Sequence, residues 1–379
     1  VLGNQVVFDP GTDFDELGSD DTAIVTVSYT MADNEGLEDS ATVVITVTGS
    51  NDGPIAVADT GGGIEGVVQT IDVLANDTDV DAGDDASNFT LLSASITGVS
   101  GLAGATGSVA VVDNQLQFDP GTDFDVLSTG EVATVTVSYT MADDEGSEDI
   151  GTATITVVGT NGEPGAVPDF GGGDENEVLT IDVLANDTDP DGDDDPSTFI
   201  LTNVSITGVT GLSTPLGGAV SIEGNQLQFD PGTDFDELDT GDIATVTVSY
   251  TLADNEGLTD SSTVTITVTG SNDGPSINVS AANAFSEFAN ASSQPLTDSG
   301  AISFDDPDAD DIIDVTFEAD GDPVWFDGQL SPAMRAALLG GLSLSAIGQA
   351  VPGATTWDYS APDLDLDFLG EGETISWSY

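Results

Sequence analysis

The chain alternates apolar and polar residues over long stretches. In residues 133–139, Val135, Val137 and Tyr139 are separated by Thr and Ser, and residues 263–268 follow the same pattern. A period of two predicts β-strands with one face in a core and the other in water. Long strands of this kind are typical of antiparallel β-sandwiches, so we expect an all-β fold.

The stretches between these strands contain turn-forming residues. Residues 141–146 and 252–257 are rich in Asp, Asn and Gly, which predicts that each joins two strands into a hairpin. The helical period is nearly absent. One short helix is predicted over 331–339, because Ser331 can cap its start, a proline fits the first turn and Gly340 can end it.

Internal repeats define the domain organisation. The string NQLQFDPGTDFD at 114–125 recurs unchanged at 225–236, and a close copy lies at 4–17. A period of about 110 residues suits a linear array of domains of immunoglobulin size. We predict the C-terminal part of one repeat, two complete repeats, and a divergent repeat without its last hairpin, with these boundaries: 1–53, 54–163, 164–274 and 275–379. The linkers at 51–54, 161–164 and 272–275 are called the first, second and third junctions.

The charge of the chain is extreme. Seventy acidic residues stand against one basic residue, Arg335, and the formal net charge is −69. A nucleic acid partner is excluded because no basic patch can form. Cys and His are absent, which excludes disulfides, zinc sites with N or S ligands and Ser–His–Asp catalysis. No apolar run is long enough for membrane insertion. The natural partners are cations, and carboxylates are ligands that calcium accepts.

The order of the strands places the acidic loops. In the second repeat, the loop at 75–88 and the hairpin turn at 141–146 fall at the end nearest the preceding linker, whereas 118–125 falls at the opposite end. Each junction should therefore collect carboxylates from the upstream domain, the linker and the downstream domain. Such a cluster needs a counter-ion, and calcium takes six to eight oxygen ligands. The sequence thus predicts calcium bound between neighbouring repeats.

The predicted ligands fall into three sets. At the first junction they are Asp9, Asp13, Asp15, Asn51, Asp52, Asp77, Asp79, Asp81, Asp143 and Glu145. At the second junction they are Asp119, Asp123, Asp125, Asn161, Glu163, Asp187, Asp189, Asp191, Asp254 and Glu256. At the third junction they are Asp230, Asp234, Asp236, Asn272, Asp273, Asp305, Asp306, Asp308 and Asp310.

Several strings in the two complete repeats resemble known repeats. VLANDTD, the TVSYT hairpin and the closing TVTG-x-NDGP are similar to bacterial cadherin-like and immunoglobulin-like repeats, and GAISFDDPDADD with the final GETISWSY resembles the VCBS repeat. The resemblance implies calcium-dependent sandwiches, secretion to the cell surface, and a place in the extension arm of a large RTX-type adhesin. Two features depart from it: NGEP replaces NDGP at 161–164, and the glycine triplets Gly61–Gly63 and Gly171–Gly173 are expected as flexible turns or bulges.

Other functions remain open at this point. The repeats could be protomers of an extracellular filament, sheath or surface layer, with identical chains as partners. The last repeat could bind glycans, because it carries all three tryptophans, of which Trp325 is expected to be the most exposed. An enzyme of the glycosidase type is disfavoured, since no cleft-building architecture is visible and the repeats share the same acids.

Overall fold

The computed structural model describes residues 5–214, 217–289, 293–308, 311–345 and 348–379. The chain divides into two compact units. The first comprises residues 1–165, 187–199 and 253–260, and the second comprises 166–186, 200–252 and 261–379. Within the described residues, no helix has the length and apolar character needed to cross a membrane.

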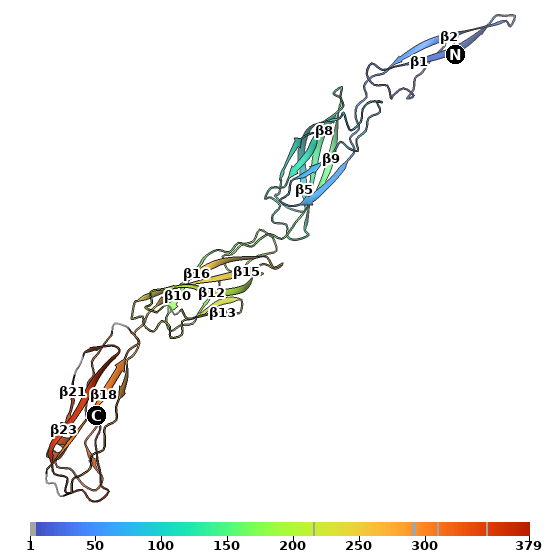
Figure 1. The fold of residues 1–379 in the computed structure, drawn as a ribbon. Helices are drawn as coiled ribbons and strands as arrows, with labels where there is room; N and C mark the ends of the chain where they lie inside the picture. Colours follow the sequence, from blue (N-terminus) through green and yellow to red (C-terminus); the bar gives the residue numbers. More distant parts are fainter. Residues whose placement is uncertain (1–4, 215–216, 290–292, 309–310, 346–347) are drawn as a thin grey trace. The chain divides into compact units, whose positions relative to one another are not determined.

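The second repeat is a sandwich of two sheets. Its four-stranded sheet has the order β3 (Asp59–Ile64), β9 (Glu148–Val158), β8 (Val132–Ala142), β5 (Thr90–Ser100). Its three-stranded sheet has the order β4 (Gln69–Ile71), β7 (Gln115–Asp119), β6 (Ser108–Val112). Strands β5, β8 and β9 run side by side in Figure 1. The hairpin of β8 and β9 is the one predicted from the turn at 141–146.

The third repeat has the same plan. Its four-stranded sheet has the order β10 (Asp169–Asp174), β16 (Thr259–Thr269), β15 (Ile243–Ala253), β12 (Ile200–Thr210). Its smaller sheet has the order β11 (Leu179–Ile181), β14 (Gln226–Asp230), β13 (Ala219–Glu223). The first repeat contributes one hairpin, β1 (Thr22–Ala32) with β2 (Glu38–Thr48). Tandem immunoglobulin-like or cadherin-like sandwiches are therefore the architecture of this chain.

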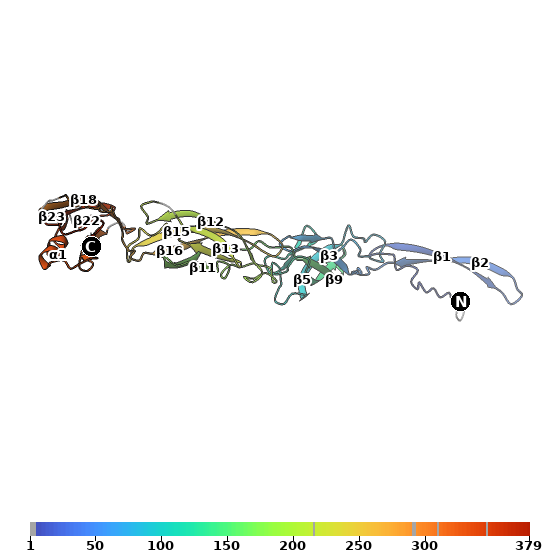
Figure 2. The same cartoon turned by 90° about the horizontal axis from the view of Figure 1, so that it is seen from below.

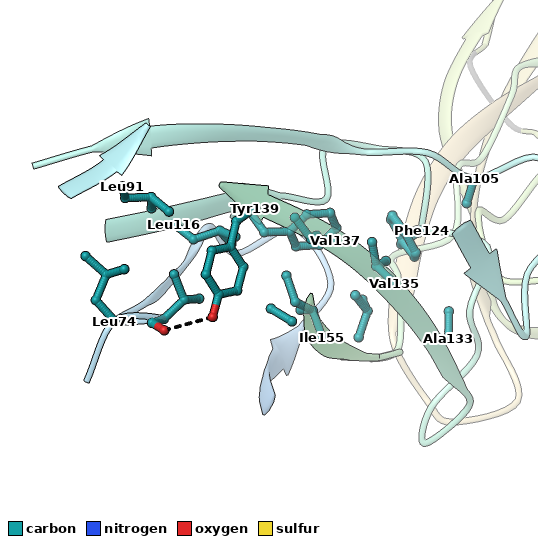
Figure 3. Close-up of a cluster of buried hydrophobic side chains, with 14 of the residues drawn as sticks. Leu74, Leu91, Ala105, Leu116, Phe124, Ala133, Val135, Val137, Tyr139 and Ile155 are labelled. Carbon is teal, nitrogen blue, oxygen red and sulfur yellow. Dashed lines mark hydrogen bonds between the residues drawn. The ribbon is translucent and has the colours of Figure 1, made fainter. Parts of the chain in front are cut away.

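The core of the second repeat lies between its two sheets. Val135, Val137 and Tyr139 are buried on β8, as the alternation predicts, and they pack with Leu116 of β7 and Ile155 of β9 (Figure 3). Each such side chain contributes about 1.5–3 kcal/mol by leaving water.

The hydroxyl of Tyr139 is anchored as well as buried. It lies 3.2 Å from the backbone carbonyl oxygen of Val73, the dashed line of Figure 3, and 2.9 Å from Oδ2 of Asp59. The buried ring thus fixes β8 against the beginning of the domain, since its polar end needs a partner inside the protein.

The glycine triplets correct one expectation. They form β3 and β10, which are edge strands rather than turns or bulges. A Cβ on Gly61 would lie 2.3 Å from Cδ1 of Ile71, and one on Gly62 would lie 2.8 Å from the carbonyl oxygen of Thr156. The triplet lets this strand approach its neighbours closely. The pairing of β3 with β9 is parallel, and so is that of β10 with β16, so the four-stranded sheets of the second and third repeats each include one parallel pair.

The last repeat carries the predicted helix, α1 (Pro332–Leu339). Ser331 caps it by accepting the N–H of Met334, and the N–H of Gly340 closes its end on the carbonyl of Ala336. Helix α1 lies beside β23 in Figure 2, and the hydroxyl of Tyr359 donates to the carbonyl of Leu338 at 3.0 Å. The strands of this repeat are β17 (Ser276–Val279), β18 (Gln294–Asp305), β19 (Ile312–Ile313), β20 (Val324–Trp325), β21 (Leu342–Leu344), β22 (Gln349–Ala350), β23 (Gly353–Leu364) and β24 (Ile375–Ser376).

The expected last strand over GETISWSY is shorter than predicted. Only β24 is extended there, because it pairs only with the two residues of β20. Trp325, expected to be the most exposed of the three tryptophans, is half-buried against Phe368, with the two ring centroids 4.8 Å apart.

Candidate metal centres at the domain junctions

One loop conformation occurs at all three junctions. It is built from three aspartates at spacings of two and three residues, and the three sets are Asp79, Asp81 and Asp84; Asp189, Asp191 and Asp194; and Asp306, Asp308 and Asp311. The side chain of each first aspartate accepts the N–H of the second, at 3.0, 2.9 and 3.3 Å respectively. The N–H of each third aspartate donates to the backbone carbonyl of the second, which closes the turn. We call these loops the aspartate triads.

At the second junction the triad meets the linker. The N–H of Gly162 donates to Oδ2 of Asp191 at 2.9 Å, and Nδ2 of Asn161 donates to Oδ2 of Asp254 at 2.9 Å. Carboxylate oxygens of Asp189, Asp191 and Asp194 lie within 4.8 Å of one another. Linker, triad and hairpin turn therefore converge at one place.

The upstream domain reaches the same place. The N–H of Gly192 donates to the carbonyl of Val126 at 3.1 Å, and the hydroxyl of Ser128 donates to Asp193. The charges of Asp191, in the downstream domain, and Asp125, in the upstream domain, both contribute to raising the pKa of Glu65.

The third junction repeats the contact between linker and triad. The N–H of Asp273 donates to Oδ2 of Asp308 at 2.8 Å. Carboxylate oxygens of Asp306, Asp308 and Asp311 lie within 4.8 Å of one another. Burial raises the pKa of Asp273, and the charges of Asp236, Asp308 and Asp306 raise it further.

The first junction shares the linker contacts. The N–H of Asp52 donates to Oδ2 of Asp81 at 2.8 Å, and Nδ2 of Asn51 donates to Oδ2 of Asp143 at 2.9 Å. Here the third triad member gathers with the hairpin turn instead, because Asp84, Asp144 and Glu145 form the cluster within 4.8 Å. The hydrogen bond to Asp144 and the surrounding charges raise the pKa of Glu145 to about 7.

The triads hold buried oxygens that no protein donor reaches. Asp308 is fully buried and its Oδ1 has no partner, and Asp191, only 3% exposed, likewise leaves Oδ1 without one. The further unpartnered buried oxygens at these sites belong to Asn51, Asp79, Asp81, Asn161, Asp189, Asp194, Asp273 and Asp306. Burying a carboxylate oxygen without a hydrogen-bond donor is costly. Because such oxygens recur at all three junctions, they point to a ligand that binds oxygen.

Two glutamates missed by the sequence reasoning belong to the same sites. Glu65 follows the glycine triplet of β3, and its Oε1 accepts both the N–H and the hydroxyl of Thr160 in the linker. Glu175 holds Ser271 in the same way, at 2.7 and 2.8 Å. In both, Oε2 is buried without a partner. Burial is the main cause that raises the pKa of each glutamate. Their recurrence after both triplets was the available signal.

Some predicted ligands serve their own domains. Asp77 accepts the N–H of Val57 at 2.7 Å inside the second repeat, and Asp123 accepts three donors from Thr106 and Gly107, which lower its pKa. In the same manner Asp9, Asp119 and Asp230 each accept the N–H two residues later, and Asp234 accepts the N–H of Gly218. These carboxylates join none of the clusters found among the described residues.

The remaining predicted ligands differ in exposure. Asp187 is buried and Asp236 is half-buried. The exposed ones are Asp13, Asp15, Glu163, Glu256, Asn272 and Asp305. Asp310 lies outside the described residues.

The donor set fits a hard divalent cation. All the ligand atoms are oxygens, supplied mainly by carboxylates in loops, which suits the six to eight ligands at 2.3–2.6 Å that calcium takes. Asp-rich loops without a Glu at the twelfth position are not EF-hands, and Asn88 and Thr198 occupy those positions. A calcium ion would bring the counter-charge that the triads and the two buried glutamates lack.

Comparison with protein families identifies the repeats. The model of the bacterial Ig domain matches residues 51–156 and 161–267, together more than half of the chain. The chain belongs to the bacterial Ig domain family. Residues 51–156 and 161–267 are thus bacterial Ig domains. No match to a curated protein sequence was found.

Solved structures similar to this chain include strings of cadherin domains. The protocadherin gamma B7 extracellular cadherin domains 1–4 align over 94% of this chain and 91% of their own, with 13% identity and a TM-score of 0.38. The protocadherin gamma B4 extracellular domain aligns over 99% and 55%, with 11% identity and a TM-score of 0.41. Mouse cadherin-23 domains EC22–24 align over 65% and 74%, with 16% identity and a TM-score of 0.37.

Proposed function

We propose that this chain is the calcium-stiffened extracellular repeat region of a large bacterial surface adhesin of the RTX type, with a VCBS-like last repeat. It acts as an extension arm and has no catalytic role. The observation that carries the proposal is the recurrence of one aspartate triad, with buried unpartnered oxygens, at each of three junctions. A solvated acidic surface would not place its carboxylates in this way.

Calcium would act by joining groups from both sides of a linker. At the second junction, Glu65 comes from the upstream domain, Asn161 from the linker and Asp191 from the downstream domain. An ion held by all three would fix the linker against both neighbours, so a flexible string would become stiff. Without the ion, the same carboxylates repel one another and favour opening.

The test compares the full chain in millimolar calcium with the same chain in excess chelator, at matched ionic strength. We expect calcium to raise the unfolding temperature, and small-angle scattering to show an extended, stiff particle only in its presence. Magnesium should act more weakly, because it keeps its waters and prefers octahedral sites. If calcium changes neither quantity, the proposal is wrong. Calcium-driven association in sedimentation would instead favour the filament alternative.

A further inference from the structure

The three junctions differ at the linker position that follows Asn51, Asn161 and Asn272. Asp52, Gly162 and Asp273 stand at the same place, and each donates its backbone N–H to the second aspartate of its triad, at 2.8, 2.9 and 2.8 Å. The same backbone hydrogen bond thus holds this linker position at all three junctions. The side chain here is a carboxylate at the first and third junctions and is absent at the second.

At the third junction this side chain lies beside the aspartate triad. Asp273 is half-buried, its Oδ2 is buried without a partner, and the charges nearest to it are those of Asp236, Asp308 and Asp306. A cation bound by the triad would meet this oxygen as a further charged ligand. Asp273 therefore adds one carboxylate to the site.

At the second junction that carboxylate has no substitute. A Cβ on Gly162 would lie 2.5 Å from Cγ of Pro190, so the proline ring occupies the space where the side chain would begin. The acid of this linker is displaced by one residue to Glu163, whose side chain is exposed.

The second and third junctions share two further features. Each has a complete triad with oxygens within 4.8 Å. Each also has an upstream glutamate, Glu65 or Glu175, with one buried unpartnered oxygen. The second junction also contains Asp254, but both of its oxygens already accept protein donors, Oδ2 from Asn161 and Oδ1 from backbone N–H groups of its own turn. The carboxylates that remain available for an ion therefore differ by Asp273, and calcium affinity depends on the number of charged ligands.

We infer that the second junction binds calcium at least about tenfold more weakly than the third. As calcium falls, the second junction empties first, and the array becomes flexible there while the third junction stays stiff. This inference rests on the proposed calcium function and adds an order to the loss of ions. The linker at 161–164, where NGEP replaces NDGP, would thereby act as a hinge that opens when the calcium concentration falls.

The experiment is a calorimetric calcium titration of the full chain and three variants. Gly162→Asp/Pro190→Val restores the pair Asp52 and Val80 of the first junction, Pro190→Val alone is its control, and Asp273→Gly copies the second junction into the third. We expect the double variant to bind one class of ions at least about tenfold more tightly than the control. Asp273→Gly should weaken one class by a similar factor.

Two outcomes overturn the inference. One is a double variant that folds and titrates like Pro190→Val, and the other is Asp273→Gly that titrates like the wild type. Should circular dichroism show the double variant unfolded, Asp273→Gly decides alone. If no variant binds calcium, the proposed function itself fails. Binding in a single class that no substitution changes refutes only the ordering.

Discussion

Replacing Asp308 by Asn should change stability in opposite directions with and without calcium. Asp308 is fully buried, its Oδ2 accepts the N–H of Asp273, and its Oδ1 has no donor. Asn keeps the acceptor for that N–H. Its amide group replaces the unpartnered oxygen and can donate to Asp306, whose carboxylate lies within 4.8 Å. In chelator, the substitution thus converts a repulsion into an attraction.

The magnitude follows from the distance. Two charges about 5 Å apart repel by about 3 kcal/mol at an effective dielectric constant near 20, and an unsatisfied buried oxygen costs about 1–3 kcal/mol. Partial relief of both should stabilise the metal-free last repeat by about 1–3 kcal/mol. With calcium at about a thousand times its dissociation constant, the wild type gains about 4.1 kcal/mol, which exceeds the upper limit of that stabilisation. A variant that loses this gain should then be the less stable of the two.

Tryptophan fluorescence during urea unfolding measures this locally, because all three tryptophans lie in the last repeat. Asp314→Asn is the matched control, since its side chain is exposed and lies in the same domain. It should change little under either condition. If Asp308→Asn destabilises equally in calcium and in chelator, its carboxylate has a purely structural role and the reasoning fails.

Three further substitutions extend these tests. Glu175→Gln keeps the acceptor for Ser271 but loses the charge, so the calcium concentration needed to protect the chain from unfolding should rise about tenfold. The control Glu177→Gln changes an exposed side chain and should leave that concentration unchanged. Gly270→Ala should cost about 1–3 kcal/mol in thermal unfolding, because its Cβ would lie 2.4 Å from the carbonyl of Asp239, whereas Gly274→Ala meets nothing and should be neutral. Burial raises the pKa of Asp59 to about 6, so the stability that this group contributes is complete below about pH 4 and is lost as pH rises through 6. In urea unfolding between pH 4 and 7, Asp59→Asn should lack this fall in the free energy of unfolding. An unchanged fall would contradict the assignment.

Much of the fold could be predicted from local pattern. The alternation around Val135 predicted which face is buried, because a strand repeats every two residues and the core selects one side. The helix at 332–339 followed from its capping residues. The glycine strands were missed, because the need for glycine lies in the close approach of Ile71, a contact between strands that sequence alone does not reveal.

Strand direction predicted part of how the acidic residues gather at the junctions, and packing between strands decided the rest. Linker and loop residues such as Asn161 and Asp191 were placed together by strand direction, and the structure brings them to one cluster. Asp194 was missed because it stands three residues after Asp191, outside the alternate spacing of the first three aspartates of the loop. Glu65 lies far from the linker in sequence, and only the packing of β3 against β9 brings it to Thr160.

The parallel pairing of β3 with β9 determines how a domain responds to tension. β3 lies near the start of the second repeat and β9 near its end, and the two strands run side by side over six residue pairs. Pulling on the two linkers slides these strands past each other in opposite directions. The hydrogen bonds between them are then loaded together, in shear, and none can open before the others. A domain connected in this way resists force along the chain better than one whose terminal strands could be peeled apart bond by bond.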